Sequence, residues 1–178
     1  MKSRAGLAYG AVMFGPRFAP LALSAVAIVV ACATPPAETP EVPPGAADSA
    51  SPGARCVADA SAALGAVTDE PREIEVAHVL VKWSGADRAD ASIARDREEA
   101  CLRAVEALQA LKNGESFEDV VATYSDEAGA ETRGGVIGEV SREDVAAAFA
   151  DAAFRLEVGQ VSHVVESPFG FHLILRSR

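Results

Sequence analysis

The sequence predicts a globular domain of the α+β class from about Cys56 onward, and three observations support this prediction. Residues 74–83 (IEVAHVLVKW) are rich in β-branched residues and apolar on both alternating faces, which is typical of an interior strand covered on both sides. Apolar residues recur at helical spacing within residues 93–113. The chain closes on two short strands, expected at residues 161–166 and 170–176. The order is therefore strand, helices, strand, helix, strand, strand.

Capping residues delimit the first two helices. The apolar residues at helical spacing, which we expect to face the core, are Cys101, Leu102, Val105, Leu108 and Leu111. Gly114 follows the expected end of this helix, at the position that favours glycine. Ser116, with Asp119 three residues later, is a capping signature for a second helix over residues 117–124.

The next segment repeats the same logic. Gly134 and Gly135 turn the chain into a short strand over residues 136–140. Ser141 and Asp144 repeat the capping signature and predict a helix over residues 144–155.

The first 31 residues have the pattern of a targeting segment. They contain three basic residues and no acid, and residues 18–31 are apolar apart from Ser24. Fourteen helical residues span about 21 Å, short of the roughly 30 Å hydrocarbon core of a bilayer. This run ends in Val29-Val30-Ala31-Cys32, which resembles a bacterial lipobox, and it predicts a signal peptide (residues 1–31) with lipidation of Cys32. An uncleaved membrane anchor with an incidental cysteine is the alternative.

A tether and a lead-in segment are expected before the domain. Six of the ten prolines fall within residues 32–55, among Ala, Ser and Gly, which favours an extended, polyproline-like tether. Residues 56–73 form the lead-in, in which the Ala-rich stretch 57–67 predicts a short helix.

Charge and cysteine content exclude several classes of function. The 16 basic and 26 acidic residues give a net charge of −10, which argues against nucleic-acid binding. The spacing of the three cysteines matches no zinc motif. If the chain is exported, Cys56 and Cys101 form an even pair that a disulfide could join, although a helical cysteine at an apolar position is commonly just buried.

Five ordered segments resemble parvulin-type peptidyl-prolyl cis/trans isomerases, over residues 74–178. They are AHVLVK (77–82), FEDVVATYSDE (117–127), RGGVIGEV (133–140), AFADAAFRLEVGQVS (148–162) and ESPFGFHLILR (166–176). The resemblance implies a parvulin-like fold of the FKBP-like superfamily. This is a four-stranded antiparallel sheet flanked by about four helices, in the order β-α-α-α-β-α-β-β.

The resemblance also implies a set of catalytic residues. His78 and His172 match the family's central histidine pair, and strand alternation puts His78 on the same face as Val76 and Leu80. Glu127 stands where the family carries cysteine or an acidic residue, which excludes covalent catalysis there. Ser167 aligns with a hydroxyl-bearing position beside the second histidine. The alternatives are a hydrogen-bonded core residue for each histidine and a solvated loop residue for Glu127.

Four apolar residues match the positions that line the family's proline pocket, although each is also compatible with an ordinary core position: Ile137, Val145, Phe149 and Phe169. The family carries a longer Met or Leu at the position of Val145, so the slot is expected to be wider or shallower. Asp87 and Asp90 lie among the basic residues of the loop after the first strand and would repel a phosphate, so recognition is expected to be independent of phosphorylation.

These patterns predict a lipid-anchored prolyl isomerase of the cell envelope, with its domain facing the periplasm or exterior. Its partners would be unfolded or extended proline-containing polypeptides of exported proteins, and the membrane through the lipid. No cofactor, metal or nucleic acid is expected. The main alternative keeps the fold and groove but acts as a non-catalytic, peptide-binding chaperone. A purely structural lipoprotein is disfavoured by the number of matched segments.

Overall fold

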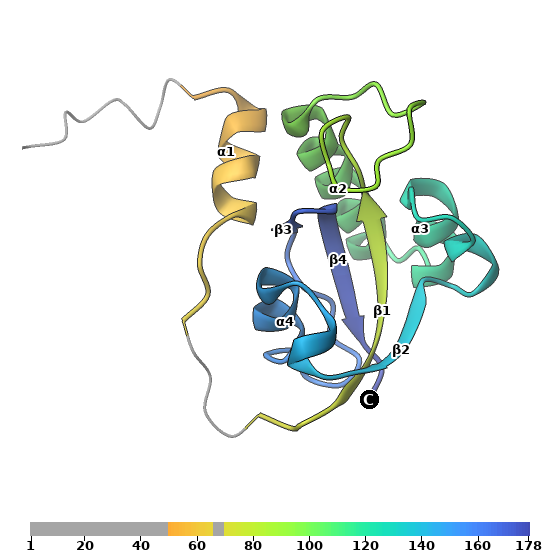
Figure 1. Cartoon of the computed structure of the whole chain (residues 1–178). Helices are drawn as coiled ribbons and strands as arrows, with labels where there is room; N and C mark the ends of the chain where they lie inside the picture. The colour runs from red at the N-terminus through yellow and green to blue at the C-terminus, as the bar shows by residue number, and fades with distance from the viewer. Residues whose placement is uncertain (1–49, 66–69) are drawn as a thin grey trace, which may run out of the picture. The chain divides into compact units, whose positions relative to one another are not determined.

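The structure, a computed structural model, describes residues 50–65 and 70–178 (Figure 1). The predicted signal peptide, Cys32 and the tether up to residue 49 lie outside these residues, so their predictions stay predictions. Within the two described ranges, no helix combines the length and the hydropathy needed to cross a bilayer.

Four antiparallel strands form one sheet in the order β2-β1-β4-β3. The two central strands are β1 (Ile74–Val81) and β4 (Gly170–Arg176), and the outer strands are β2 (Val136–Val140) and β3 (Val165–Ser167). The residues of β1 and β4 are nearly all buried. The predicted interior position of the first strand is therefore confirmed, as is the four-stranded antiparallel sheet.

Helices cover both faces of this sheet, as predicted (Figure 1). Helices α2 (Arg97–Lys112) and α3 (Phe117–Tyr124) lie on one face, and α4 (Ala147–Ala153) lies on the other. The third helical segment between β1 and β2 is a single 3₁₀ turn, Ala130–Thr132. The capped start predicted at Ser116 is present, because its side chain accepts from the Asp119 N–H. The long helix begins at Arg97 rather than at residue 93, and Asp96 and Glu99 form a capping box there that was not predicted.

The buried stripe of α2 differs from the prediction. Leu102 and Val105 are exposed at 37% and 43%, so placing them in the core was wrong. The residues that face the sheet are small, namely Ala100, Cys101, Ala104, Ala107 and Ala110. Small side chains let the helix axis approach the sheet closely, and the adjacent stripe of larger residues is then left at the edge of the contact.

A helix also occupies the end of the predicted tether. Helix α1 spans Pro52–Ala60, so residues 52–55 are not tether and the helix expected over residues 57–67 is shifted. Proline is compatible with the first helical position because its missing N–H has no partner there. Ser51 caps this start by accepting from the Ala54 N–H at 2.9 Å.

Two boundaries near the C-terminus were also wrong. The Ser141–Asp144 capping box closes a 3₁₀ turn, Arg142–Asp144, and α4 begins only at Ala147 after an extended Val145. In the predicted strand 161–166, Val161 forms an isolated bridge to Leu175, and regular pairing begins at Val165. The Ser162 hydroxyl accepts from the Ile174 N–H at 2.9 Å, replacing a backbone acceptor of the ladder.

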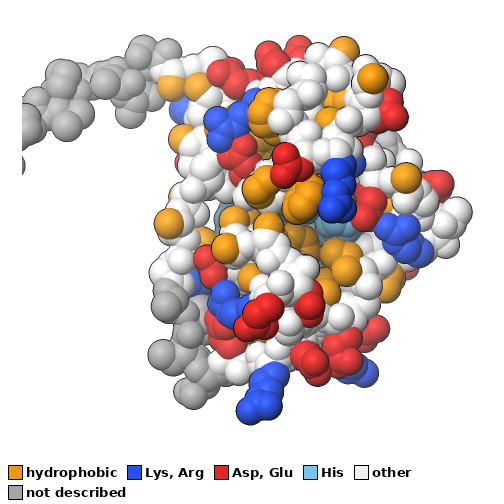
Figure 2. All heavy atoms as spheres, in the orientation of Figure 1, with side chains coloured by type: hydrophobic (Ala, Val, Ile, Leu, Met, Phe, Trp, Pro, Cys, Tyr) orange, Lys and Arg blue, Asp and Glu red, His pale blue; other side chains and the backbone are white. Residues whose placement is uncertain are grey.

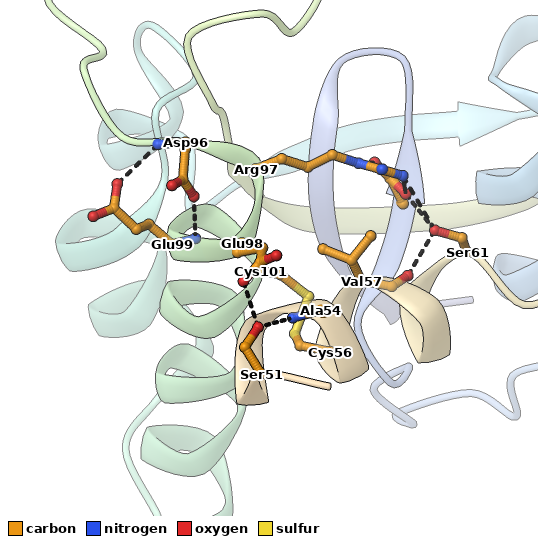
Figure 3. The surroundings of a disulfide bond; sticks show 11 residues. Ser51, Ala54, Cys56, Val57, Ser61, Asp96, Arg97, Glu98, Glu99 and Cys101 are labelled. Atoms are coloured by element: carbon orange, nitrogen blue, oxygen red, sulfur yellow. Dashed lines mark hydrogen bonds and ion pairs between the residues drawn. A yellow bond between two sulfur atoms is a disulfide. The ribbon is translucent and has the colours of Figure 1, made fainter. Parts of the chain in front are cut away.

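A disulfide joins Cys56 of α1 to Cys101 of α2, with their Cα atoms 6.0 Å apart (Figure 3). Of the two alternatives left open by the sequence, the structure contains the bridged form. The disulfide fixes the lead-in helix against the long helix of the domain.

Candidate active site

His78 of β1 and His172 of β4 meet on the face of the sheet covered by α4. His172 lies opposite Leu80 in the register and His78 lies opposite Ile174, so both rings project to the same side. Both residues are buried, and their Nδ1 atoms are 3.2 Å apart. The predicted pairing of the two histidines is thus present.

A glycine sets the close approach of strand β2 to His78. The His78 N–H donates to the Gly135 carbonyl at 2.8 Å. Gly135 has a φ of +73°, and a Cβ there would lie 2.3 Å from the His78 carbonyl oxygen. Only glycine satisfies both the left-handed conformation and this contact.

The loop after α3 places Glu127 beside His78. Asp126 anchors this loop to the end of β1, because its carboxylate accepts from the Lys82 N–H at 2.8 Å and from Arg95 at 2.5 Å. The Asp126 N–H in turn donates to the Leu80 carbonyl at 2.7 Å. Glu127 Oε2 then lies 2.9 Å from His78 Nε2 and 2.7 Å from Arg133 Nη2. Glu127 is therefore a held, half-buried carboxylate, not a freely solvated one.

Ser167 completes the chain at the other end. Its Oγ lies 2.6 Å from His172 Nε2 and accepts from the Phe169 N–H at 3.1 Å. One continuous line of hydrogen bonds thus runs along the sheet face covered by α4, through Arg133, Glu127, His78, His172 and Ser167.

The ionised Glu127 fixes the direction of this line when both rings are neutral. Glu127 can only accept, so His78 donates from Nε2 and its Nδ1 is an acceptor. His172 must then donate from Nδ1, and its Nε2 accepts from the Ser167 hydroxyl. The hydrogen bond from His78, together with the charge of Arg133, holds the pKa of Glu127 below its ordinary value despite partial burial. Burial lowers the pKa of His172 well below its ordinary value, so this ring is neutral near pH 7.

An apolar cavity of about 160 Å³ lies above the two histidines. All four predicted pocket residues line it, together with His78, His172 and Ser167: Ile137, Val145, Phe149 and Phe169. The Phe149 ring is edge-on to both imidazoles, with its centroid 5.9 Å from that of His78 and 5.2 Å from that of His172. Figure 2 shows hydrophobic side chains gathered around the middle of this face.

Two placements were not foreseen. Glu127 is not among the residues that line the cavity, and it is linked to them through its hydrogen bond to His78. Asp144 and Ala146 do line it. Both belong to the segment that sequence reasoning assigned to the start of a helix, and the extended backbone at Val145 and Ala146 is what brings them to the wall.

The loop after β1 carries both charge signs beside the pocket. The Arg88 guanidinium lies 5.5 Å from the centroid of the Phe169 ring, and Lys82 Nζ donates to the Arg88 carbonyl at 2.9 Å. Asp87 and Asp90 belong to the same loop, and hydrogen bonds from Ser92 lower the pKa of Asp90. Among the described residues, no group of three or more His, Cys, Asp or Glu side chains could hold a metal ion.

The chain is similar in sequence to known proteins. The sequence profile of the PPIC-type PPIase domain matches residues 62–176. A putative peptidyl-prolyl cis-trans isomerase, dodo of Drosophila melanogaster, is 40% identical over 113 residues, which are 61% of this chain and 68% of that protein. The foldase protein PrsA 4 of Bacillus cereus is 33% identical over 102 residues, but the match covers 57% of this chain and only 30% of the relative.

Solved structures agree with the fold. Peptidyl-prolyl isomerase ESS1 from Candida albicans superposes with a TM-score of 0.56 at 28% identity, covering 63% of this chain and 66% of that one. TbPIN1 superposes with a TM-score of 0.53 at 31% identity, covering 60% of this chain and 98% of that one. With the profile match extending over most of the described residues, the chain belongs to the PPIC-type, or parvulin, family of peptidyl-prolyl cis/trans isomerases.

Proposed function

We propose that this protein catalyses cis/trans isomerisation of X-Pro bonds in exported proteins, as a membrane-tethered folding factor that needs no phosphorylation of its substrate. The observation that carries the proposal is an apolar cavity closed by Phe149 above a directed chain of hydrogen bonds through His78 and His172. A pocket of this kind holds a proline ring while the preceding amide turns.

The chemistry requires no bond to be made or broken. Resonance in the planar amide gives the C–N bond partial double-bond character and a rotation barrier of about 18–20 kcal/mol. Twisting removes this resonance and with it part of the charge separation between amide nitrogen and oxygen. A water-poor, apolar slot lined by Phe149 and Val145 therefore favours the twisted form over the planar one.

The line of hydrogen bonds holds the side chains below this slot in fixed orientations. His78 and His172 each use both ring nitrogens in hydrogen bonds, which fixes the orientation of each ring below the cavity. Glu127 is one hydrogen bond further from the cavity, so it is a positioning residue that holds the His78 tautomer and contributes fixed negative charge behind it. No proton needs to leave this network during turnover.

The independence from phosphorylation is supported by the charges of the loop. Asp87 and Asp90 offset Lys82 and Arg88, and the Lys82 ammonium is already bonded to a carbonyl of the loop. The two carboxylates would repel a dianionic phosphate placed there. Replacing Ser by phospho-Ser before the proline should therefore give no gain in kcat/KM.

Tethering and export are supported by the sequence before α1 and by the disulfide. The lipobox-like Val29-Val30-Ala31-Cys32 and the proline-rich stretch after it would place the domain outside the membrane. The Cys56–Cys101 bridge suits an oxidising compartment. A fatty-acid analogue should label the wild type and not Cys32→Ser, and equal labelling of the two would refute lipidation at this residue.

A protease-coupled isomerisation assay tests the activity. The full chain, purified in detergent, is given tetrapeptides with Ala, Leu, Glu, Ser or phospho-Ser before proline. We expect catalysis of the unmodified peptides well above the uncatalysed exchange, which takes tens to hundreds of seconds. Binding of proline peptides without any acceleration would instead identify the domain as a non-catalytic, peptide-binding chaperone.

A further inference from the structure

A second, larger hollow adjoins the proline pocket. This groove, of about 640 Å³, shares Ala146 and Ser167 with the pocket, so the two form one continuous surface. Its remaining walls come from five separate segments of the chain: Ser61, Trp83, Arg97, Ala147 with Ala148, and Glu166 with Pro168.

The end of helix α1 supplies one wall of this groove. The Ser61 hydroxyl is hydrogen-bonded to the carboxylate of Glu166, the residue of β3 that precedes Ser167. Arg97 at the start of α2 binds the same carboxylate through Nε at 2.5 Å and Nη2 at 2.6 Å. Burial alone would raise the pKa of Glu166, but the bonds from Arg97 and Ser61 lower it below its ordinary value. The lead-in is thus tied to the strand that carries a residue of the site.

Two further contacts hold α1 in this place (Figure 3). The Cys56–Cys101 disulfide links the middle of α1 to α2. At its start, Ser51 donates to Glu98 Oε2 at 2.6 Å, and Gly53 lies so close to the Glu98 stem that a Cβ would approach it to 2.5 Å. Helix α1 is outside residues 62–176, which match the family profile, so this wall is an addition to the shared domain.

The groove has a defined chemistry. Its apolar lining consists of Trp83, Pro168 and the small side chains at the start of α4. The two charged groups on it, Arg97 and Glu166, neutralise each other as an ion pair whose carboxylate is only 13% exposed. Such a surface suits an extended segment with small or apolar side chains, and it offers no unpaired charge to an acidic or basic one.

We propose that α1, held by the Cys56–Cys101 disulfide, completes a second subsite that binds the small or apolar residues flanking the proline in an extended substrate. The inference rests on the proposed function, because the occupant of the groove is the substrate chain whose proline fills the pocket. It predicts that long unfolded segments are better substrates than tetrapeptides, and that the advantage depends on the disulfide.

The experiment compares Ala-Ala-Pro-Phe with a twelve-residue peptide that has one Ala-Pro bond and uncharged Ala, Val and Leu residues on both sides. Ala148→Trp fills the groove from an exposed position of α4 and should lower kcat/KM for the long peptide about tenfold relative to the tetrapeptide, the size of one well-placed apolar contact. Ala122→Trp is the matched control, an exposed helical alanine of α3 outside the groove, and should change neither value.

Cys56→Ala removes the disulfide that holds α1 without altering a residue of the groove. It should lower kcat/KM for the long peptide about tenfold and leave kcat/KM for the tetrapeptide unchanged. Reduction of the disulfide in the wild type should have the same effect. Equal effects of Ala148→Trp on both peptides, or a long-peptide advantage that survives both variants, would overturn the inference. If the wild type isomerises neither peptide, the proposed isomerase activity is refuted, whatever the role of the groove. Binding of the fluorescently labelled long peptide to the same variants then still decides whether the groove is occupied.

Discussion

The two faces of the sheet are built from alternate residues of the same two strands, yet they differ in composition and in packing. On the face covered by α2 and α3, Val79 and Val81 of β1 and Phe171 and Leu173 of β4 pack in a continuous apolar cluster. On the face covered by α4, the apolar cluster is interrupted by His78 and His172, and a cavity opens above them.

This difference indicates that the α2/α3 face serves mainly folding stability and the α4 face mainly activity. The fully buried members of the cluster on the α2/α3 face are aliphatic or aromatic side chains and the disulfide-bonded Cys101, and none of them is ionisable. The α4 face leaves a space uncovered and buries two imidazoles whose hydrogen-bonding capacity must be satisfied. Substitutions on the first face should therefore change folding, whereas substitutions on the second should change the activity of the folded protein.

The largest effect is expected from truncation on the α2/α3 face. Phe171 is fully buried in β4, and Phe171→Ala should lower the free energy of unfolding by about 3–5 kcal/mol. Denaturant titration measures this loss, and an isomerisation assay normalised to the folded fraction measures the activity of the protein that remains folded. A large drop in the activity of the folded fraction would contradict the separation of the two faces.

The corresponding truncation on the α4 face should act mainly on turnover. Phe149 is buried against both imidazoles and closes the pocket. Phe149→Ala should lower kcat/KM for an Ala-Pro tetrapeptide about a hundredfold, because a wall of the slot is lost and water enters it. It should also cost some stability, so both quantities are measured on the same preparation. Unchanged kcat/KM would show that Phe149 is an ordinary core residue.

Mild acid should destabilise the α4 face through the buried His172. The pKa of His172 is lower in the folded protein than its ordinary value of 6.5, so the unfolded chain binds more protons just below that pH. The contribution of neutral His172 to the free energy of unfolding should then be fully present above about pH 7. Between pH 6.5 and 5, the free energy of unfolding should fall by at most about 1.4 kcal/mol per pH unit.

Urea titrations at several pH values check this slope. His172→Gln should flatten it, whereas His163→Gln, at an exposed histidine of the chain, should leave it as in the wild type. A wild-type free energy of unfolding that is constant from pH 7 to 5 would show that His172 is not destabilised as a cation.

Sequence reasoning predicted the site better than it predicted the lead-in. Alternation along β1 and the ordered family segments were enough to bring His78, His172 and the four pocket residues to one face. The distance of Glu127 from the cavity could not be predicted, because it depends on the anchoring of Asp126 to the end of β1. Segments remote in sequence decide such a contact.

The errors have the same origin. Periodicity predicted a helix within residues 93–113, and α2 spans Arg97–Lys112. Two adjacent stripes fit that period, and only the closeness of the sheet selects the alanines over Leu102 and Val105. For α1, composition indicated a tether because proline is abundant there, whereas Pro52 at the first helical position and the bridge to Cys101 permit a helix.

The central claim is that a charged and directed chain of hydrogen bonds supports catalysis from below the pocket. Measuring kcat/KM of Glu127→Gln tests this claim most directly. The amide oxygen can still accept from His78 while the negative charge is removed, and the side chain is one-third exposed, so stability should be little affected. We expect kcat/KM for an Ala-Pro tetrapeptide to fall about tenfold, as for the loss of one charge-assisted hydrogen bond, with the melting temperature unchanged. A variant with wild-type kcat/KM at wild-type stability would contradict the claim and leave Glu127 without a role in turnover.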